Sequence, residues 1–233
     1  MKIENYKDNK EALRALTSQL MDYMARKEEQ TPFNLALSGG ETAKQMFALW
    51  ADEYKDKIDW ENMRFFWVDE RCVPPTDAES NFGHANKLLF EPLQIPKDHI
   101  HRIHGEGEPG TEAMRYSRIV KEYLPRHGQF PYFHCIILGI GGYSHTASIF
   151  PDNLPLLTDS RNYAVSQHPE SGQFRITMTG PLILNGSPLL VPVLGKGKAA
   201  AIEELKRGYS LANATPAAYI LSHAVDSIVY TTL

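Results

Sequence analysis

The stretch of chain between residues 138 and 151 combines glycines with a histidine and has the sequence LGIGGYSHTASIFP. His145 follows an apolar run and a glycine turn, a position from which a side chain can act on a bound ligand. An imidazole has an ordinary pKa of about 6.5, so its neutral form can accept a proton near neutral pH. The sequence leaves two interpretations open: His145 is a general base, or it is a histidine at a helix start that bonds to a backbone carbonyl.

The same stretch contains Gly142-Tyr143-Ser144, which is similar to the beginning of a nucleophile elbow. Thr146 stands where the Gly-x-Ser-x-Gly pattern of such an elbow has its closing glycine. The pattern is therefore incomplete, and it argues against Ser144 as a nucleophile.

A second glycine turn has the composition of a phosphate cradle. Residues 37–42 read LSGGET, in which Ser38, Gly39 and Gly40 follow an apolar segment and precede a helical pattern. Glycines let backbone N–H groups approach an oxyanion, and the start of a helix adds a positive dipole. The alternative is a tight turn that needs glycine only for its dihedral angles. The residues match neither a Gly-x-Gly-x-x-Gly fingerprint nor a P-loop, which disfavours a dinucleotide or a nucleoside triphosphate.

Charged residues stand at the ends of several of the other apolar segments, after residues 64–68 and 189–194 and before residues 176–178. Cations in such positions can neutralise a phosphate without a basic protein surface, and an arginine can bind it in bidentate fashion. Each of these charges could also lie in a solvated loop. The residues in question are Asp69, Glu70, Arg71, Arg175, Lys196 and Lys198.

Two other groups of residues could carry different chemistry. His99, His101 and His104 could place imidazoles on one side of a strand, but no nearby cysteine or carboxylate completes a metal-ligand set. Cys72 follows Arg71 and could be an activated thiolate, but no histidine is close in sequence. We expect neither a metal site nor a cysteine nucleophile.

The elements that would position these residues alternate between strands and helices. Apolar residues at helical spacing predict helices over residues 9–27 and 41–54 and near 81–90. Alternation of this kind is typical of an α/β fold with a mostly parallel sheet and helices on both faces. Ligands bind at the carboxyl ends of such strands, where both glycine turns fall. The predicted strands cover residues 33–37, 64–68, 134–138, 164–166, 176–178, 189–194 and 228–230.

Length and composition fit one domain, residues 1–233, that is soluble and globular. The chain is 42% hydrophobic and 22% charged, with a net charge of -4, which does not favour binding to nucleic acid. Residues 1–10 are polar, and no apolar run approaches the roughly 20 residues that span a bilayer, so we expect neither a signal peptide nor a membrane anchor. Two cysteines are too few for a disulfide framework, which indicates the cytoplasm.

Taken together and in order, six segments resemble the 6-phosphogluconolactonase family, within the wider group that includes glucosamine-6-phosphate deaminase. The resemblance implies a modified Rossmann-like three-layer sandwich that uses no organic cofactor and no metal. Carried over residue by residue, the phosphate and substrate pocket comprises Ser38, Gly39, Gly40, Arg71, Arg175 and Lys198, with Asp69 and Glu70 as the acidic pair beside it and His145 as the catalytic histidine. The segments are 37–42, 66–74 with Ser80 and Asn81, 101–103, 138–151, 175–179 and 195–199.

One departure from the family pattern concerns the residues before the histidine. The family usually reads Asp-Gly-His where this chain has Tyr143, Ser144 and His145. The missing carboxylate would orient the imidazole and stabilise its protonated form. Either another acid substitutes for it or the activity is weakened.

The expectation is therefore hydrolysis of 6-phosphogluconolactone to 6-phosphogluconate in the oxidative pentose phosphate pathway, by a monomer or small homo-oligomer. One alternative is a deaminase or isomerase of an aminosugar phosphate, but that pattern has a glutamate where this chain has Phe150. A second alternative, raised by Tyr143 and Ser144, is a protein that binds a sugar phosphate without catalysis. The partner in each case is a small molecule rather than a nucleic acid or a membrane.

Overall fold

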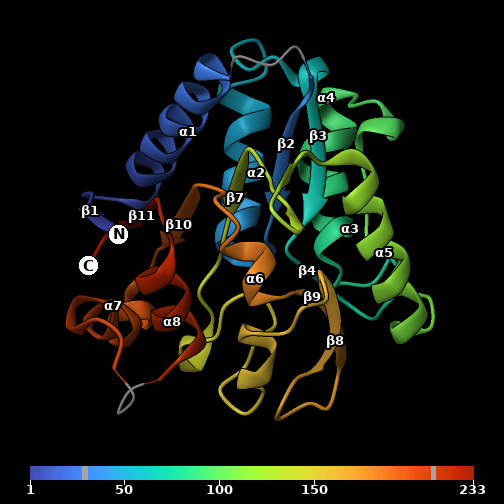
Figure 1. Cartoon of the computed structure of the whole chain (residues 1–233). Helices are drawn as coiled ribbons and strands as arrows, with labels where there is room; N and C mark the ends of the chain where they lie inside the picture. Colours follow the sequence, from blue (N-terminus) through green and yellow to red (C-terminus); the bar gives the residue numbers. More distant parts are fainter. Residues whose placement is uncertain (28–30, 211–213) are drawn as a thin grey trace.

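A six-stranded parallel sheet forms the centre of the molecule in the computed structural model, which describes residues 1–27, 31–210 and 214–233 (Figure 1). Its strand order is β1-β11-β10-β7-β2-β3, and every neighbouring pair runs parallel. The mostly parallel sheet predicted from the alternation is confirmed. The strands are β1 (Lys2–Asn5), β2 (Phe33–Leu37), β3 (Met63–Trp67), β7 (Cys135–Ile137), β10 (Leu189–Val193) and β11 (Ser227–Thr231).

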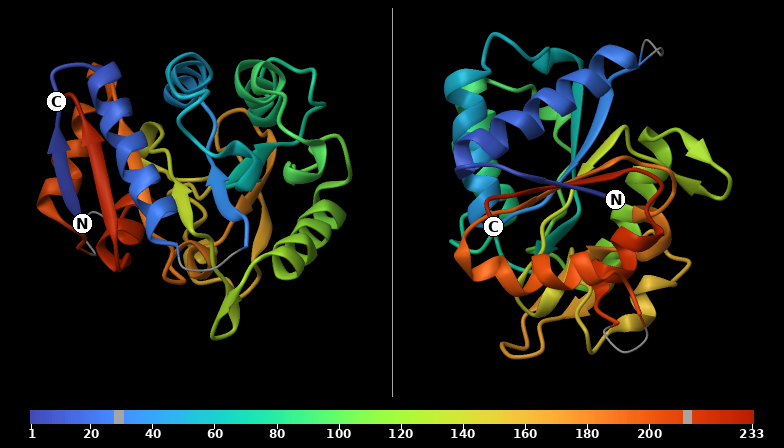
Figure 2. Two further views of the ribbon diagram at one scale, coloured as in Figure 1. Left: turned by 90° about the horizontal axis from the view of Figure 1, so that it is seen from above. Right: turned by 90° about the vertical axis from the view of Figure 1, so that its left-hand side faces the viewer.

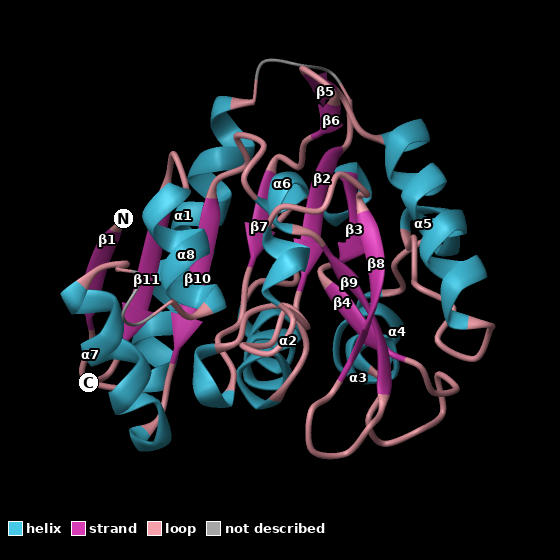
Figure 3. Ribbon diagram, turned by 60° about the horizontal axis from the view of Figure 1, so that its bottom comes forward, coloured by secondary structure: helices cyan, strands magenta, loops and turns pink. Residues whose placement is uncertain are grey.

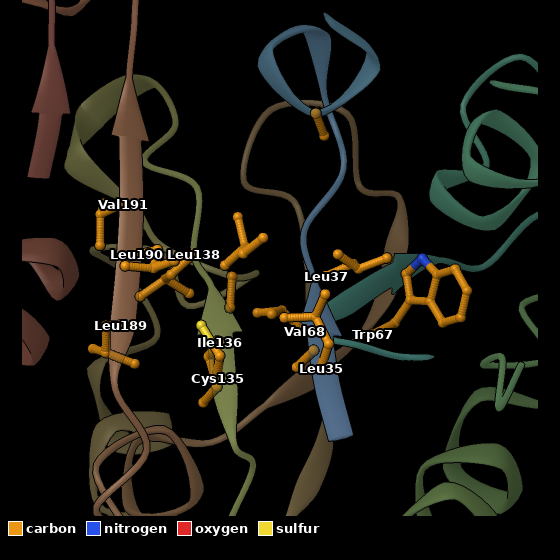
Figure 4. Packing of buried hydrophobic residues seen from close by; sticks show 14 of the residues in the cluster. Leu35, Leu37, Trp67, Val68, Cys135, Ile136, Leu138, Leu189, Leu190 and Val191 are labelled. Carbon is orange, nitrogen blue, oxygen red and sulfur yellow. The ribbon is translucent and has the colours of Figure 1, made fainter. Parts of the chain in front are cut away.

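The middle strands are apolar, apart from Asn34 in β2, because both faces of the sheet are covered. Every residue of β2 and of β10 is buried. Figure 4 shows Leu35, Cys135 and Leu190 packed on neighbouring strands, and none of the three has any exposed surface. A strand buried on both faces has no polar alternation, which is why its sequence reads as a continuous apolar run.

Helices lie on both faces, in the arrangement that right-handed crossovers require. α1 (Asn9–Arg26) and α2 (Glu41–Glu53) lead the chain from β1 to β2 and on to β3, and they lie on one face. The helical segment of residues 81–93 that follows β3 packs beside α2, and the chain then returns across the sheet, so the helices after that segment cover the other face (Figure 2). These are α5 (Pro109–Tyr123), α6 (Gly180–Ile183), α7 (Ala199–Arg207) and α8 (Pro216–His223).

The helix predicted near residues 81–90 is present but not regular. It consists of α3 (Asn81–Ala85), the π-helical segment η2 (Asn86–Phe90) and α4 (Glu91–Leu93), which follow one another without a break. α3 and η2 pack against α2. The remaining short elements are the single 3-10 turns η1 (Trp60–Asn62), η3 (Lys97–His99), η4 (Gly142–Ser144), η5 (Leu154–Leu157) and η6 (Lys196–Lys198).

A second, antiparallel sheet departs from the sequence interpretation. β8 (Tyr163–Gln167) and β9 (Phe174–Met178) form a hairpin, and β4 (Asp69–Arg71) pairs with β9 (Figure 3). The link between β8 and β9 is too short for a crossover between parallel strands, so the two strands can pair only antiparallel. A smaller hairpin joins β5 (Arg126–His127) to β6 (Phe130–Pro131).

Val68 connects the two larger sheets. Its N–H donates to Leu37 O at 2.9 Å, and its carbonyl accepts from Met178 N at 2.8 Å. Val68 is fully buried. The chain therefore passes from the parallel sheet into the antiparallel one at a single residue, with its backbone bonded to both sides.

The neighbouring strands β2 and β7 mark the point where the chain reverses its direction across the sheet. From β2 the chain turns to α2 on one face, and after β7 it turns to elements on the opposite face. The loops after these two strands therefore part at their carboxyl ends, which opens a crevice in α/β sheets of this kind.

Among the described residues, no helix is long and apolar enough to cross a membrane.

Candidate active site

A cleft of about 570 Å³ opens at the carboxyl ends of β2 and β7. It is lined by the turns after β2, β7 and β10 and by residues of β4 and β9. The convergence expected for the loops of a parallel sheet is therefore present. The cleft brings together nearly all the candidate residues, namely Ser38, Gly39, Gly40, Asp69, Arg71, His145, Arg175 and Lys198.

The glycine turn of residues 38–40 presents the start of α2 to the cleft. Gly40 precedes this 13-residue helix with φ 92° and ψ -178°, a conformation that glycine adopts without steric penalty. A Cβ at Gly39 would lie 1.8 Å from Asn81 Oδ1, so only glycine lets α3 approach this turn. Ser38 Oγ accepts a hydrogen bond from Gly139 N at 3.1 Å, which ties the two glycine turns together.

His145 is held in one tautomer by the backbone. Its Nδ1 lies 2.7 Å from Gly142 O, and because a carbonyl can only accept, Nδ1 carries the hydrogen. The Nε2 atom is then free to accept a proton. The ring lies directly over Gly141, where a Cβ would be 1.9 Å from Cε1, and 4.7 Å from the Phe150 ring.

Burial lowers the pKa of His145, and the nearby Arg175 and Lys198 lower it further. The bond to Gly142 O and the charge of Asp69 act in the opposite direction but do not reverse the shift. The imidazole is therefore neutral at pH 7. Both properties that a general base needs, a free Nε2 and a neutral ring, follow from its surroundings.

Two arginines face one another across the antiparallel sheet. Arg71 on β4 is the direct ladder partner of Arg175 on β9. Arg71 Nη1 donates to Glu79 O at 2.6 Å, and the Nε atoms of both arginines are buried with no partner in the described structure. Like charges directly opposite each other are unfavourable, so a bound anion would relieve this pair.

Arg175 is the more deeply buried of the two, with 8% of its surface exposed. Its guanidinium carbon lies 5.6 Å from the centre of the Phe150 ring, the same ring that His145 contacts. Burial lowers the pKa of Arg175, although a guanidinium keeps its charge in proteins. A positive charge is thus fixed beside the imidazole.

Lys198 lies at the entrance to α7, after Gly195 with φ 91°. Its Nζ donates to Ile140 O at 2.7 Å, and burial lowers its pKa. Within the described parts of the chain it forms no ion pair. The neighbouring Lys196 is exposed and does not line the cleft.

Of the predicted acidic pair, Asp69 lines the cleft, whereas Glu70 does not. The Asp69 carboxylate accepts from Ser148 Oγ at 2.7 Å. The two side chains point in opposite directions because residues 69–71 form a strand, in which successive side chains alternate. Asp69 and Arg71 therefore share the side that faces the cleft.

Glu70 instead fastens the start of α3. Its carboxylate accepts from the backbone N–H groups of Arg71, Asn81 and Phe82 at 2.7–2.8 Å and from Ser80 Oγ at 3.2 Å. Burial raises its pKa to about 7, against the effect of the backbone donors. Its role in the structure is to hold α3 against β4.

The other candidate groups stay outside the cleft. His101 packs between Phe66 and Tyr123, at centroid distances of 4.7 and 4.1 Å, and burial lowers its pKa to about 4. Burial raises the pKa of Cys72 to about 11, which opposes formation of a thiolate. Over the residues that are described, no three His, Cys, Asp or Glu side chains gather in a way that could hold a metal ion.

Sequence reasoning missed several residues that line the cleft. Asn9 begins α1, and its Nδ2 donates to Gln45 Oε1 at 3.1 Å, so the first helix contributes to the rim. His168 reaches the cleft from the end of the β8–β9 hairpin. Neither Asn9 nor His168 belongs to a sequence motif. His168 could have been suspected only from its place directly after a predicted strand. The side chain of Tyr143 lies outside the described part of the structure.

Comparison with known proteins gives a consistent set of relatives. Residues 7–229 match the family model described as glucosamine-6-phosphate isomerases/6-phosphogluconolactonase. The chain is 43% identical to a 6-phosphogluconolactonase of Treponema pallidum, over 81% of this chain and 78% of the relative. It is 39% identical to a 6-phosphogluconolactonase of Haemophilus influenzae, over 87% and 85%.

Solved structures share the fold over nearly the whole chain. The crystal structure of a devB protein superposes with a TM-score of 0.88 at 36% identity, covering 99% of this chain and 95% of the other. A 6-phosphogluconolactonase from Trypanosoma cruzi superposes with a TM-score of 0.86 at 23% identity, covering 99% and 93%. The second match is evidence for the fold alone.

Proposed function

This chain belongs to the glucosamine-6-phosphate isomerase/6-phosphogluconolactonase family, and we propose that it hydrolyses 6-phosphogluconolactone to 6-phosphogluconate, with His145 as the general base. The relatives that are 39–43% identical to it carry the name 6-phosphogluconolactonase. The observation that carries the proposal is a neutral imidazole, held with a free Nε2, in a cleft that also contains Arg71, Arg175 and Lys198.

The cations and the glycine turn would bind the phosphate of the substrate. Arg71 and Arg175 supply unpartnered guanidinium N–H groups, and Lys198 supplies an ammonium. The N-terminus of α2 behind Gly40 adds backbone donors. Together these groups would fix the phosphate and so reduce the entropy that is lost when C1 is brought close to His145.

The reaction needs one water molecule and one proton carrier. His145 Nε2 removes a proton from water while the water oxygen forms a bond to C1 of the lactone. The tetrahedral intermediate then breaks its bond to the ring oxygen, which takes the proton from the imidazolium. General base and acid catalysis of this kind contributes about 10²–10⁴-fold to a rate. The products are a hydroxyl in place of the ring oxygen and the open-chain carboxylic acid, which then loses its proton to solvent at neutral pH.

Asp69 is the acid best placed to replace the carboxylate that this chain lacks before His145. Its charge raises the pKa of His145, so it favours the imidazolium that forms during the reaction. The orienting part of the missing residue's role falls to the carbonyl of Gly142, which holds Nδ1–H. In this chain the Asp69 side chain would stabilise the imidazolium and the backbone at Gly142 would orient the ring, two effects that a single carboxylate before the histidine would otherwise supply.

The deaminase alternative finds less support in the cleft. Transfer of protons between C1 and C2 of an aminosugar requires carboxylates, and the position five residues after His145 is Phe150. That ring packs against both His145 and Arg175. An apolar wall at this position supplies no carboxylate for proton transfer between C1 and C2, which suits a hydrolase better than a deaminase.

An assay on freshly prepared 6-phosphogluconolactone tests the proposal. Product is measured by coupling to 6-phosphogluconate dehydrogenase, and the spontaneous hydrolysis of the lactone is subtracted. We expect rapid enzymatic hydrolysis and no release of ammonia from glucosamine 6-phosphate. Ammonia release would favour the deaminase, and binding of 6-phosphogluconate without turnover would favour a protein that only binds sugar phosphates.

Two further expectations, on cellular location and on oligomeric state, accompany this function. We propose a cytoplasmic location and a monomer or small homo-oligomer, which cell fractionation and light scattering respectively would test. Neither expectation enters the mechanism, because every residue that it uses comes from one chain.

A further inference from the structure

The residue before His145 has an unusual backbone conformation. Ser144 has φ 52°, in the left-handed region that glycine adopts easily and that residues with a Cβ rarely adopt. Ser144 closes the turn η4, which also contains Gly142 and therefore the carbonyl that holds Nδ1 of His145. The orientation of the imidazole thus depends on a turn that its own sequence does not favour.

A glutamate from another part of the chain bonds to this turn. Ser144 Oγ donates to Glu204 Oε2, and Thr215 Oγ1 donates to Glu204 Oε1. Glu204 lies on α7, and Thr215 caps the N-terminus of α8, where its hydroxyl accepts from Ala218 N at 3.4 Å. All three side chains of this network, which we call the Glu204 bridge, are half-buried.

The Glu204 bridge connects the base to the helix that follows a proposed phosphate ligand. α7 begins directly after Lys198, whose Nζ donates to Ile140 O. The segment from Ile140 to Ser144 is therefore bonded at both ends to α7 or to the residue directly before it. η4 also packs against α8, and Figure 1 shows α7 and α8 side by side.

We propose that Glu204 is a positioning residue, which holds Ser144 in its left-handed conformation and thereby keeps the His145 imidazole in its productive orientation. The kinetic part of this inference rests on the proposed function. Glu204 does not line the cleft, so its role is to position the residues that do. It supports the base in a chain where the residues before the histidine depart from the family pattern.

Kinetic measurements on Glu204→Ala test the inference against a matched control. A displacement of about 1 Å at a catalytic group can lower a rate as much as 10²-fold, so we expect kcat to fall about tenfold or more while KM stays within about twofold. Glu204→Gln should restore most of the rate, because its amide can still bond to both hydroxyls. Glu203→Ala is the control: Glu203 is exposed on the same helix, pairs with Lys206 and should leave kcat unchanged.

A second background separates positioning from simple stabilisation of α8. Glycine at residue 144 adopts φ 52° without support, so in a Ser144→Gly protein the additional change Glu204→Ala should cost little in kcat. Loss of the bond to Thr215 should lower the melting temperature equally in both backgrounds. If Glu204→Ala lowers kcat equally in both, or changes only the melting temperature, the positioning role is wrong.

An NMR measurement keeps the inference testable without turnover. The ¹⁵N shifts of the His145 ring in the wild-type chain should report a neutral ring with hydrogen on Nδ1, and Glu204→Ala should mix the two tautomers. If the wild type does not hydrolyse the lactone, the proposed function is wrong. The tautomer of His145 in Glu204→Ala then still tests whether Glu204 positions the ring. An unchanged tautomer in Glu204→Ala overturns the inference even in an active enzyme.

Discussion

Replacing Arg175 with methionine should weaken substrate binding without weakening the fold. Arg175 is 8% exposed, its Nε has no partner among the described residues, and it stands opposite Arg71 in the β4–β9 ladder. In the free protein its burial is therefore poorly compensated. Methionine fills similar space, can pack on the Phe150 ring and removes the repulsion.

The expected size of the effect follows from one charged contact. A hydrogen bond to a charged group contributes about 1.5–3 kcal/mol, which corresponds to a change in affinity of about 10- to 150-fold. KM for the lactone should rise within this range, while the free energy of unfolding stays constant or increases by up to about 1 kcal/mol. His145 keeps its contact with Phe150, so kcat should change less than KM.

Steady-state kinetics and thermal unfolding of Arg175→Met measure both quantities. Lys196→Met is the matched control, because Lys196 is an exposed cation close to the cleft but not in its lining. The reasoning is refuted if Arg175→Met has the KM of the wild type, or if both methionine variants raise KM equally. A fall in melting temperature of about 5 °C or more would show that Arg175 stabilises the free protein after all.

Further predictions concern the base and its supports. His145→Ala should lower kcat by about 10²–10⁴-fold with little change in KM. In the wild type, kcat/KM should fall at acidic pH as His145 is protonated, with a midpoint below the ordinary pKa of about 6.5. If the pH profile of His145→Ala still shows this acidic decline, His145 is not the base. Gly141→Ala places a Cβ 1.9 Å from His145 Cε1 and should lower kcat. Gly142→Ala is the control, because a Cβ there meets nothing within 4 Å, and it should lower kcat less. Equal losses of kcat would show that the position of the imidazole does not depend on the absence of a side chain at residue 141. The folded-state pKa of Glu70 is raised to about 7, so its protonated form favours folding below the unfolded value near 4.5, and that contribution is lost as pH rises through about 7. Melting curves between pH 5 and 8 should therefore show a decline in the wild type that is reduced in Glu70→Gln, and parallel curves for the two proteins would argue against the shift.

The sequence was sufficient to predict the cleft because the cleft depends on strand ends. Glycine turns after two apolar strands, at residues 38–40 and 139–142, had to meet at one edge of a parallel sheet. The structure brings them together through the bond from Gly139 N to Ser38 Oγ. Periodicity also located α1 and α2 to within one residue of their observed bounds.

The second sheet and the direction of Glu70 could not be predicted in the same way. Short apolar runs, such as those at residues 164–166 and 176–178, indicate strands but do not identify the strands with which they pair. Had residues 69–71 been recognised as a strand, the alternation of side chains would have separated Glu70 from Asp69. Glu204 was beyond reach because its bond to Ser144 joins residues 60 positions apart.

The hairpin of β8 and β9 contributes two kinds of residue to the cleft, and these can change at different rates during evolution. Arg175 lies in β9 close to the hairpin end, where it pairs with Ser166 of β8 on one side and Arg71 of β4 on the other. The end itself, closed by the bond from Gly172 N to His168 O, carries a residue of the cleft rim. Hairpin ends accept insertions and substitutions more readily than strands do. Natural variation or directed mutagenesis in residues 168–173 can therefore reshape the mouth of the cleft, and with it the range of lactones admitted, while the base and the phosphate ligands keep their places.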